Sequence, residues 1–327
     1  MEIVSVKNLT KKFKDFTAVD GITFDVQEGE IFGLLGPNGA GKTTTIRMLI
    51  TLIPPFSGGA TVAGSDILKD RDRVRENIGI VFQDPALDRQ LTGRENLDFH
   101  ARMYNMPREK RLQKITEVLE LADLTEKADE LVENYSGGMQ RRLEIARGLM
   151  HAPKVLFLDE PTLGLDVQTR RKIWDYIQKL NRDQGTTILI TTHYMDEADY
   201  LCGRVGIMNR GKIVALDTPR NLKNLIGADV VTLEMENGDP GPFGKLDYVK
   251  KTVAHGNLVN LSVENGERKI PLLMEFAQSQ GVKIKSVELH KPSLEDVFLQ
   301  YTGTTIKEVN TDTEERSRIG MNIRRGR

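Results

Sequence analysis

The sequence has almost no cysteine, no long apolar run and no excess of either charge. Its 327 residues include a single cysteine, Cys202, which excludes a disulfide within the chain. The longest apolar runs, such as residues 154–158 and 48–53, fall far short of the roughly 20 residues that cross a bilayer. The N-terminus also lacks the basic-then-apolar pattern of a secretion signal. These absences predict a protein that does not span a membrane and that works in a reducing cytosol.

The charge balance narrows the choice of partners. The 46 lysines and arginines nearly cancel the 47 aspartates and glutamates, which leaves a formal net charge of -1. No global basic field is present to hold nucleic acid or an anionic membrane. Hydrophobic residues at 39% and charged residues at 28% are typical of an ordinary globular protein. The length predicts about two domains, at roughly 150 residues each.

Three changes of pattern divide the chain. Residues 1–220 alternate short β-rich runs with helical patterns, which predicts an α/β domain of βαβ units around a mostly parallel sheet. Within it, residues 84–150 turn charged and helical and predict an inserted helical subdomain. Short strands among Gly/Pro-rich turns predict a small α+β domain over residues 221–302. Residues 303–327 are polar and aperiodic, so we expect a flexible tail.

Apolar spacing locates the expected elements. After Gly41, apolar residues at positions 46, 49, 50 and 53 predict a helix that Pro54 and Pro55 end. Apolar residues at positions 112, 115, 118, 119 and 122 predict another. The other expected helices are residues 271–280 and 293–301, and the expected strands are residues 22–26, 31–35, 78–82, 154–158, 186–191, 258–263 and 282–289.

A phosphate-binding loop stands between an apolar strand and an amphipathic helix. Residues 36–43 satisfy G-x-x-x-x-G-K-[ST], and this strand–loop–helix context is the one that the motif requires. Glycines let backbone N–H groups curl around a polyphosphate, Lys42 reaches the terminal phosphates, and the Thr43 hydroxyl ligates Mg²⁺. The sequence therefore predicts ATP and Mg²⁺ as ligands. The residues expected to contact the nucleotide here are Gly36, Pro37, Asn38, Gly39, Ala40, Gly41, Lys42, Thr43 and Thr44.

A second apolar strand, residues 154–158, leads into Asp159 and Glu160. A fully apolar strand lies inside a sheet, and its carboxyl end opens onto the crevice where ligands bind. We expect Asp159 to hold the Mg²⁺ shell and Glu160 to accept a proton from the attacking water. On its own, an Asp-Glu pair is equally typical of a solvated strand end.

Three further segments bear on the same site. His193 follows the strand at residues 186–191 and Gln83 follows the strand at 78–82, so both are expected at the edge where Asp159 lies. We expect His193 to contact the γ-phosphate, although a lone histidine is usually structural. Ser136, Gly137 and Gly138 open another helix and could form a second anion site, although an ordinary N-cap explains the serine as well.

Together these residues resemble the ATP-binding cassette family, the nucleotide-binding subunits of ABC transporters. The resemblance covers about residues 2–220 and implies an α/β P-loop NTPase cassette with a mixed sheet core, plus the small C-terminal α+β domain. Phe13 stands where the family places an aromatic that stacks on adenine, and Phe16 is a nearby alternative. The family's motifs occur in order: Walker A at Gly36–Thr43, the Q-loop at Gln83, the signature at Tyr135–Met139, Walker B at Asp159 and Glu160, the D-loop at Leu163–Asp166, and the switch at His193.

This resemblance implies a homodimer in which two cassettes enclose two ATP molecules. The Ser136–Gly138 segment of one subunit closes on the γ-phosphate held by the other, and Asp166 also lies at the nucleotide. Glu160, His193 and Gln83 take the catalytic roles, and Thr43, Gln83 and Asp159 hold the metal. The signature departs from the commonest family pattern at Tyr135 and Met139, where leucine and glutamine are usual.

Residues 83–96 and 292–303 are similar to the daunorubicin-resistance type of exporter ATPase. That branch implies a separate membrane permease of the ABC-2 type, export of drugs or lipids, and a place at the cytoplasmic face of the cell membrane. The alternative is a soluble ABC ATPase acting on nucleic acid or the ribosome. We see no coiled-coil or zinc insertion and no second cassette, and the balanced charge predicts no nucleic-acid partner.

Overall fold

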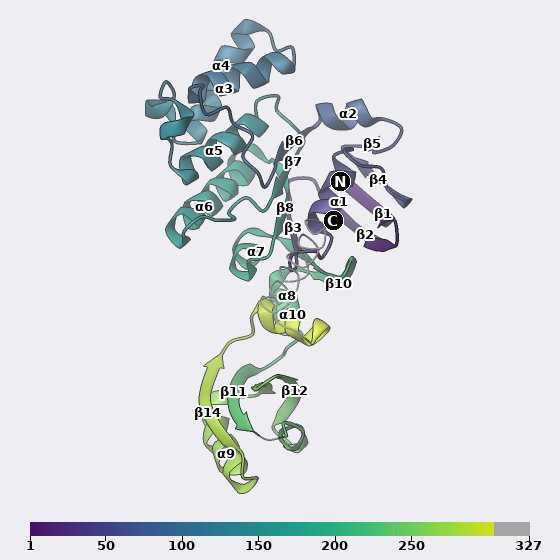
Figure 1. Ribbon diagram of the computed structural model, residues 1–327, viewed down its shortest axis with the longest axis vertical. Coiled ribbons are helices and arrows are strands. Elements are labelled where there is room, and N and C mark those ends of the chain that lie inside the picture. Colours follow the sequence, from purple (N-terminus) through teal and green to yellow (C-terminus); the bar gives the residue numbers. More distant parts are fainter. Residues whose placement is uncertain (238, 304–327) are drawn as a thin grey trace, which may run out of the picture. The chain divides into compact units, whose positions relative to one another are not determined.

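The computed structural model describes residues 1–237 and 239–303 and divides into two compact units, with the boundary after Ile213 (Figure 1). Most of the predicted tail, residues 304–327, lies outside the described residues. Across the described part of the chain, no helix is both long enough and apolar enough to cross a membrane.

A six-stranded sheet forms the centre of the first unit. Every residue is buried in its strands β3 (Ile31–Leu35), β7 (Val155–Asp159) and β8 (Thr187–Thr192), which explains why these segments are almost continuously apolar. Parallel pairs join β9 to β3, β3 to β8, β8 to β7 and β7 to β6, so β7 is an interior strand. The order across the sheet is β10 (Lys212–Asp217), β9 (Arg204–Asn209), β3 (Ile31–Leu35), β8 (Thr187–Thr192), β7 (Val155–Asp159) and β6 (Ile78–Val81).

A separate antiparallel sheet takes residues that we expected among the βαβ units. The segment 22–26 lies in β2, which pairs antiparallel with β1, for example Val4 with Val26. Within residues 22–26 the alternating pattern buries Ile22, Phe24 and Val26, as in a strand covered on one face. The order of this sheet is β2 (Phe16–Gln27), β1 (Glu2–Phe13), β4 (Ser57–Val62) and β5 (Ser65–Asp66).

The helices of the first unit include a group beside β6. There α3 (Gly93–Met103), α4 (Arg108–Leu121) and α5 (Gly137–Gly148) pack against one another, and α5 contacts β6 (Figure 1). The predicted stripe of α4 is buried from Ile115 onward, but Leu112, near the start of the helix, is 49% exposed. The other helices are α1 (Lys42–Leu49), α2 (Arg71–Glu76), α6 (Val167–Gln184) and α7 (Met195–Leu201), with 3-10 turns at Thr125–Lys127 and Val132–Asn134.

The helix after the phosphate loop is shorter than predicted. It ends at Leu49 instead of continuing to Ile53, because Thr51 adopts a left-handed backbone with φ 66° that no α-helix can include. The prolines at 54 and 55 therefore follow a turn and do not themselves stop the helix.

The second unit is a small α+β fold. Its antiparallel sheet has the order β12 (Val249–His255), β13 (Leu258–Val263), β11 (Asp229–Asn237) and β14 (Lys283–His290). The core gathers Val231, Leu233 and Leu261 of the sheet with Leu273 and Ala277 of α9. The helices are α8 (Pro219–Asn224), α9 (Gly266–Ser279) and α10 (Leu294–Thr302), with a 3-10 turn at Gly241–Lys245.

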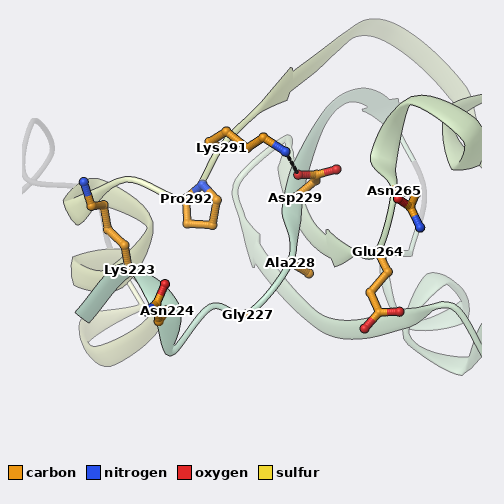
Figure 2. A pocket seen from close by; sticks show the side chains of 9 residues that line it. All are labelled: Lys223, Asn224, Gly227, Ala228, Asp229, Glu264, Asn265, Lys291 and Pro292. Carbon is orange, nitrogen blue, oxygen red and sulfur yellow. Dashed lines mark hydrogen bonds and ion pairs between the residues drawn. The ribbon is translucent and has the colours of Figure 1, made fainter. Parts of the chain in front are cut away.

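The prediction that a helix begins at Pro271 is wrong, because α9 starts at Gly266 and holds Pro271 inside it. An open cavity of about 620 Å³ lies beside this helix start (Figure 2). Asp229 accepts a hydrogen bond from the Gly266 N–H at 2.9 Å and one from the Lys291 ammonium at 2.6 Å. This carboxylate ties the first turn of α9 to β11 and to the residue after β14, in place of the start that Pro271 would have given.

Candidate nucleotide-binding and catalytic site

The phosphate loop links β3 to α1 and is packed too tightly for side chains at two glycines. A Cβ on Gly36 would lie 2.3 Å from the Met208 carbonyl oxygen. At Gly41, the backbone φ is 105° and a Cβ would lie 2.6 Å from the Ala18 carbonyl oxygen. Among the nine predicted contact residues, Asn38 and Gly39 are exposed, Gly41, Thr43 and Thr44 are half-buried, and Gly36, Pro37, Ala40 and Lys42 are buried.

Lys42 points into the loop and reaches the end of β7. Its ammonium donates to the carbonyl oxygens of Gly36 at 2.7 Å and Pro37 at 3.1 Å, and it lies 3.1 Å from Glu160 Oε1. Only 4% of the side chain is exposed. Burial lowers the pKa of this ammonium, although the charge of Glu160 acts in the opposite direction.

The Asp159 carboxylate lies beside two hydroxyl groups. Its Oδ1 accepts from the Thr43 hydroxyl at 3.1 Å and from the Thr191 hydroxyl at 2.6 Å. Burial raises the pKa of Asp159 above its ordinary value. A hydroxyl from α1 and a carboxylate from β7 are the kind of oxygen ligands that Mg²⁺ prefers, so the residues present fit this ion.

Glu160 is held in an unusual backbone conformation. Its φ of 48° is left-handed, which costs a non-glycine residue about 1–2 kcal/mol. The Glu160 N–H donates to the hydroxyl and to the carbonyl oxygen of Thr191, both at 3.1 Å. The surrounding contacts therefore maintain the strain, and strain of this kind tends to gather at functional sites.

The Glu160 carboxylate lies between the Lys42 ammonium and the His193 ring. His193 Nδ1 is 3.1 Å from Oε2, on the side away from Lys42. Burial acts to raise the pKa of Glu160, but the His193 hydrogen bond and the Lys42 charge outweigh it and lower the pKa overall. The structure thus brings Lys42, Glu160 and His193 together, as the sequence predicted for the edge of this sheet.

Gln83 and the two candidate aromatics are more peripheral. Gln83 is exposed and follows β6, whose Val81 pairs with Leu158 of β7, so it lies at the same end of the sheet as Asp159. Phe13 and Phe16 are paired across the β1–β2 hairpin and are 48% and 62% exposed. Both have a ring face to offer, and a lysine ammonium, from Lys11, lies 5.1 Å from the Phe13 ring centroid.

The signature residues pack against the D-loop segment. Ser136 caps α5 by accepting from the Met139 N–H at 3.3 Å, while Gly137 and Gly138 form its first turn. A Cβ on Gly138 would lie 2.6 Å from Thr169 Cγ2. Asp166, expected at the nucleotide, is the N-cap of α6, and its carboxylate accepts from the Thr169 N–H at 3.0 Å and hydroxyl at 2.6 Å.

We therefore expect Gly138→Ala to destabilise the protein by about 1–3 kcal/mol, because the new methyl group overpacks the contact with Thr169. Thermal unfolding of the purified chain measures this. Adding Thr169→Ser should restore most of the loss, since serine removes the methyl group and keeps the hydroxyl on Asp166. Gly137→Ala is the matched control, because its Cβ meets only the flexible Leu165 side chain at 3.3 Å. A Gly138→Ala protein as stable as the wild type would contradict the steric account.

Sequence reasoning missed several polar residues of the site. Thr191 supports both Asp159 and Glu160, and its place at the end of an apolar strand could have indicated this. Glu197 of α7 is fully buried and accepts from the Thr162 hydroxyl and the Trp174 indole, both at 2.7 Å. Burial raises the pKa of Glu197. Arg141 of α5 is also buried.

Comparison with known families gives two matches along the chain. Residues 19–163 match the family described as "ABC transporter". Residues 218–302 match the family described as "ATP-binding protein DrrA1-3-like, C-terminal domain". The two matches fall on the first unit and on the second unit, respectively.

Individual proteins are similar over nearly the whole chain. The chain is 39% identical to a daunorubicin resistance ATP-binding protein of Streptomyces coeruleorubidus, over 95% of this chain and 98% of that protein. It is 37% identical to a linearmycin resistance ATP-binding protein of Bacillus subtilis, over 94% and 100%. A dimeric ATP-binding cassette solved in a post-hydrolysis state with ADP and Pi is 30% identical, with a TM-score of 0.59 over 66% of this chain and 98% of that one.

Proposed function

The chain belongs to the ABC transporter family, in the branch of daunorubicin-resistance ATP-binding proteins, and we propose that it drives export as a homodimer bound to a separate membrane permease. It is an ATPase, as its family and its cassette fold establish. The exported molecule is proposed to be a drug or a lipid, and the names of two similar proteins, for resistance to daunorubicin and linearmycin, support the drug.

The buried contact between Lys42 and Glu160 carries the proposed chemistry. Lys42 and the N–H groups of the loop hold the phosphates of ATP, and Glu160 accepts the proton of the water that attacks the γ-phosphate. Against the effect of burial, the His193 hydrogen bond and the Lys42 charge lower the pKa of Glu160. When Lys42 turns toward the γ-phosphate, its part of this lowering is lost and Glu160 becomes a stronger base. Phosphate binding therefore activates the group that takes the proton.

Thr43 and Asp159 would hold Mg²⁺, with Gln83 as a further ligand from the end of β6. When bound, this ion neutralises charge on the β- and γ-phosphates. His193 contacts the γ-phosphate and keeps the Glu160 carboxylate oriented through the 3.1 Å contact at Nδ1. Phe13 or Phe16 stacks on the adenine.

The signature segment serves the ATP held by the partner subunit. Ser136 and Gly137 are exposed at the N-terminus of α5, where unpaired N–H groups and the helix dipole favour an anion. Asp166 of the D-loop lies at the same face, through the Thr169 contact with Gly138. The cassette that is 30% identical and was solved as a dimer with ADP and Pi supports the dimer that this contact requires.

A groove beside the helical subdomain is the proposed seat of a short cytoplasmic helix of the permease. It has a cavity of about 600 Å³ between α4 and the residues after α5, with apolar Met106 and Met150. Tyr104 and His151 stack in it with ring centroids 4.0 Å apart. Lys110, Lys114 and Glu117 of α4 line it as well. Because the groove offers both apolar and charged side chains, it suits a single amphipathic helix.

Co-purification from native membranes tests this function. A tagged chain should retain a polytopic membrane protein after detergent extraction. Tyr104→Glu should abolish this retention and leave ATP hydrolysis by the isolated chain unchanged, because Tyr104 lies in the groove and not at the phosphate loop. Leu68→Glu, at another exposed apolar residue, is the matched control and should retain the membrane protein. Recovery of the chain solely with ribosomes or DNA would contradict the proposal.

The alternative of a soluble ABC ATPase acting on nucleic acid or the ribosome is not favoured. Several relatives that match over nearly the full length are named as resistance or export ATP-binding proteins. The balanced charge of the chain gives no basic footprint for nucleic acid.

A further inference from the structure

A buried arginine joins three parts of the site, and none of the motifs accounts for it. Arg141 lies in the second turn of α5, three residues beyond the Ser136–Gly138 segment. Only 7% of it is exposed. A guanidinium cannot lose its charge in a protein, so its burial must be compensated by a complete set of acceptors.

The acceptors of Arg141 are mainly backbone carbonyl groups around Glu160. Nε donates to the Pro161 oxygen at 2.6 Å, and Nη2 donates to the oxygens of Asp159 and Glu160, both at 3.3 Å. Nη1 donates to the Phe82 oxygen at 2.7 Å, immediately before Gln83. One planar guanidinium therefore fixes the backbone on both sides of Glu160 and the start of the Q-loop.

Glu144 completes the cluster one turn further along α5. It is 3% exposed, and its Oε2 accepts from Arg141 Nη1 at 2.7 Å. Its Oε1 accepts from the Ala86 N–H at 2.8 Å. The Ala86 carbonyl oxygen in turn accepts from the Arg147 guanidinium. Arg141 and Glu144 thus hold the Q-loop region to α5 at two points, the Phe82 carbonyl oxygen and the Ala86 N–H.

These contacts bear on the strained residue of the site. Glu160 has a left-handed backbone, and the carbonyl groups of residues 159, 160 and 161 all accept hydrogen bonds from Arg141. Packing alone would be served as well by apolar side chains of similar volume, since replacing a buried ion pair in that way is often neutral or stabilising. The backbone acceptors all lie in the segment around Glu160 or at the start of the Q-loop, which indicates that the guanidinium orients the backbone there.

We infer that Arg141 is a positioning residue for ATP hydrolysis: with Glu144, it fixes the Glu160 backbone and the start of the Q-loop to the signature helix. It touches no reacting atom and acts through Glu160. The inference rests on the proposed role of Glu160 as the base. It also means that a displacement of α5 or of the Q-loop is transmitted directly to the Glu160 backbone.

A double-mutant cycle in the full-length protein tests this. Arg141→Met should lower kcat by about 10- to 100-fold, because a small misplacement of a catalytic group costs about that much, and should change KM for ATP by less than about threefold. In a Glu160→Gln background, adding Arg141→Met should lower kcat by less than about twofold, since the two residues act through one group. If Arg141 had only a structural role, the losses of kcat caused by Arg141→Met and by Glu160→Gln would be independent and would multiply in the double variant.

Arg142→Met is the matched control on the neighbouring residue. Arg142 donates to the Ala122 carbonyl oxygen at 2.7 Å and to Asp123 Oδ2 at 3.1 Å, within the helical subdomain. Its kcat should stay within about twofold of the wild type. If Arg141→Met does not fold, Arg141→Lys goes through the same cycle, because lysine keeps the charge and loses the fork of donors.

Two results would overturn the inference alone: a wild-type kcat for the Arg141 variants, or losses that multiply with Glu160→Gln. A Glu160→Gln protein with unchanged kcat would instead overturn the proposed role of Glu160, and the inference with it. The single variants therefore distinguish the two failures.

Discussion

Glu160→Gln is expected to slow ATP turnover by about 10²- to 10⁴-fold while ATP stays bound, because it removes a general base and little else. Glutamine has nearly the same shape and can still meet His193 Nδ1, which lies 3.1 Å from Oε2 in the wild type. It cannot accept a proton from water at neutral pH. Phosphate release under saturating ATP measures the turnover, and equilibrium binding of radiolabelled ATP measures the retention.

The same variant should also accumulate as an ATP-bound dimer, since the closed state is no longer resolved by hydrolysis. Light scattering with and without ATP measures the fraction of dimer. Glu133→Gln, at an exposed position just before the signature segment, is the matched control and should turn over ATP normally. A Glu160→Gln protein that stays monomeric with ATP would count against the homodimer, and one with wild-type turnover would count against the base.

The second large effect is expected from Lys42→Ala, which should weaken ATP binding by about 10- to 150-fold. A hydrogen bond to a charged group is worth about 1.5–3 kcal/mol, and the phosphates would lose their buried counter-charge. The ammonium is 4% exposed and bonded to two loop carbonyl groups, so alanine would also remove a buried donor that those two oxygens share. Calorimetric titration with ATP gives the affinity.

Two further substitutions serve as controls for Lys42→Ala. Lys154→Ala removes an exposed lysine at the start of the strand that ends in Asp159, and it should leave the affinity unchanged. Lys42→Arg should not restore binding, because the buried slot between Gly36, Pro37 and Glu160 fits a compact ammonium and not a planar guanidinium. Wild-type affinity in Lys42→Ala would contradict the phosphate role of this residue.

Local sequence patterns were enough to predict the parts of the fold that depend on local physics. The strand at residues 31–35 and the glycines that follow it are set by burial on both faces and by close backbone approach. The antiparallel sheet was not predicted, because pairing of β1 with β2 and β4 joins segments that look alike as isolated amphipathic strands. In the second unit, β11 buries Val231, Leu233 and Met235 in alternation, a signal that was present and overlooked.

The candidate site also contains residues that the sequence could locate and residues that it could not. The sequence placed Asp159, Glu160 and His193 at one sheet edge, because parallel strands bring their carboxyl ends together. It could not show that Asp166 caps α6, since an N-cap and a ligand contact use the same carboxylate. Nor could it show where Arg141 points, because apart from Glu144 the partners of its guanidinium are backbone groups 18 to 59 residues away, which no local pattern marks.

The contact between Lys42 and Glu160 has an energetic consequence for the nucleotide. On the proposed role of Lys42, the Glu160 carboxylate competes with the γ-phosphate for the same ammonium. Part of the favourable energy of ATP binding would then be offset by separating the pair, and the affinity for ATP would be lower than the phosphate contacts alone would give. The carboxylate released from Lys42 would be the better proton acceptor, so weaker binding of ATP would accompany faster hydrolysis.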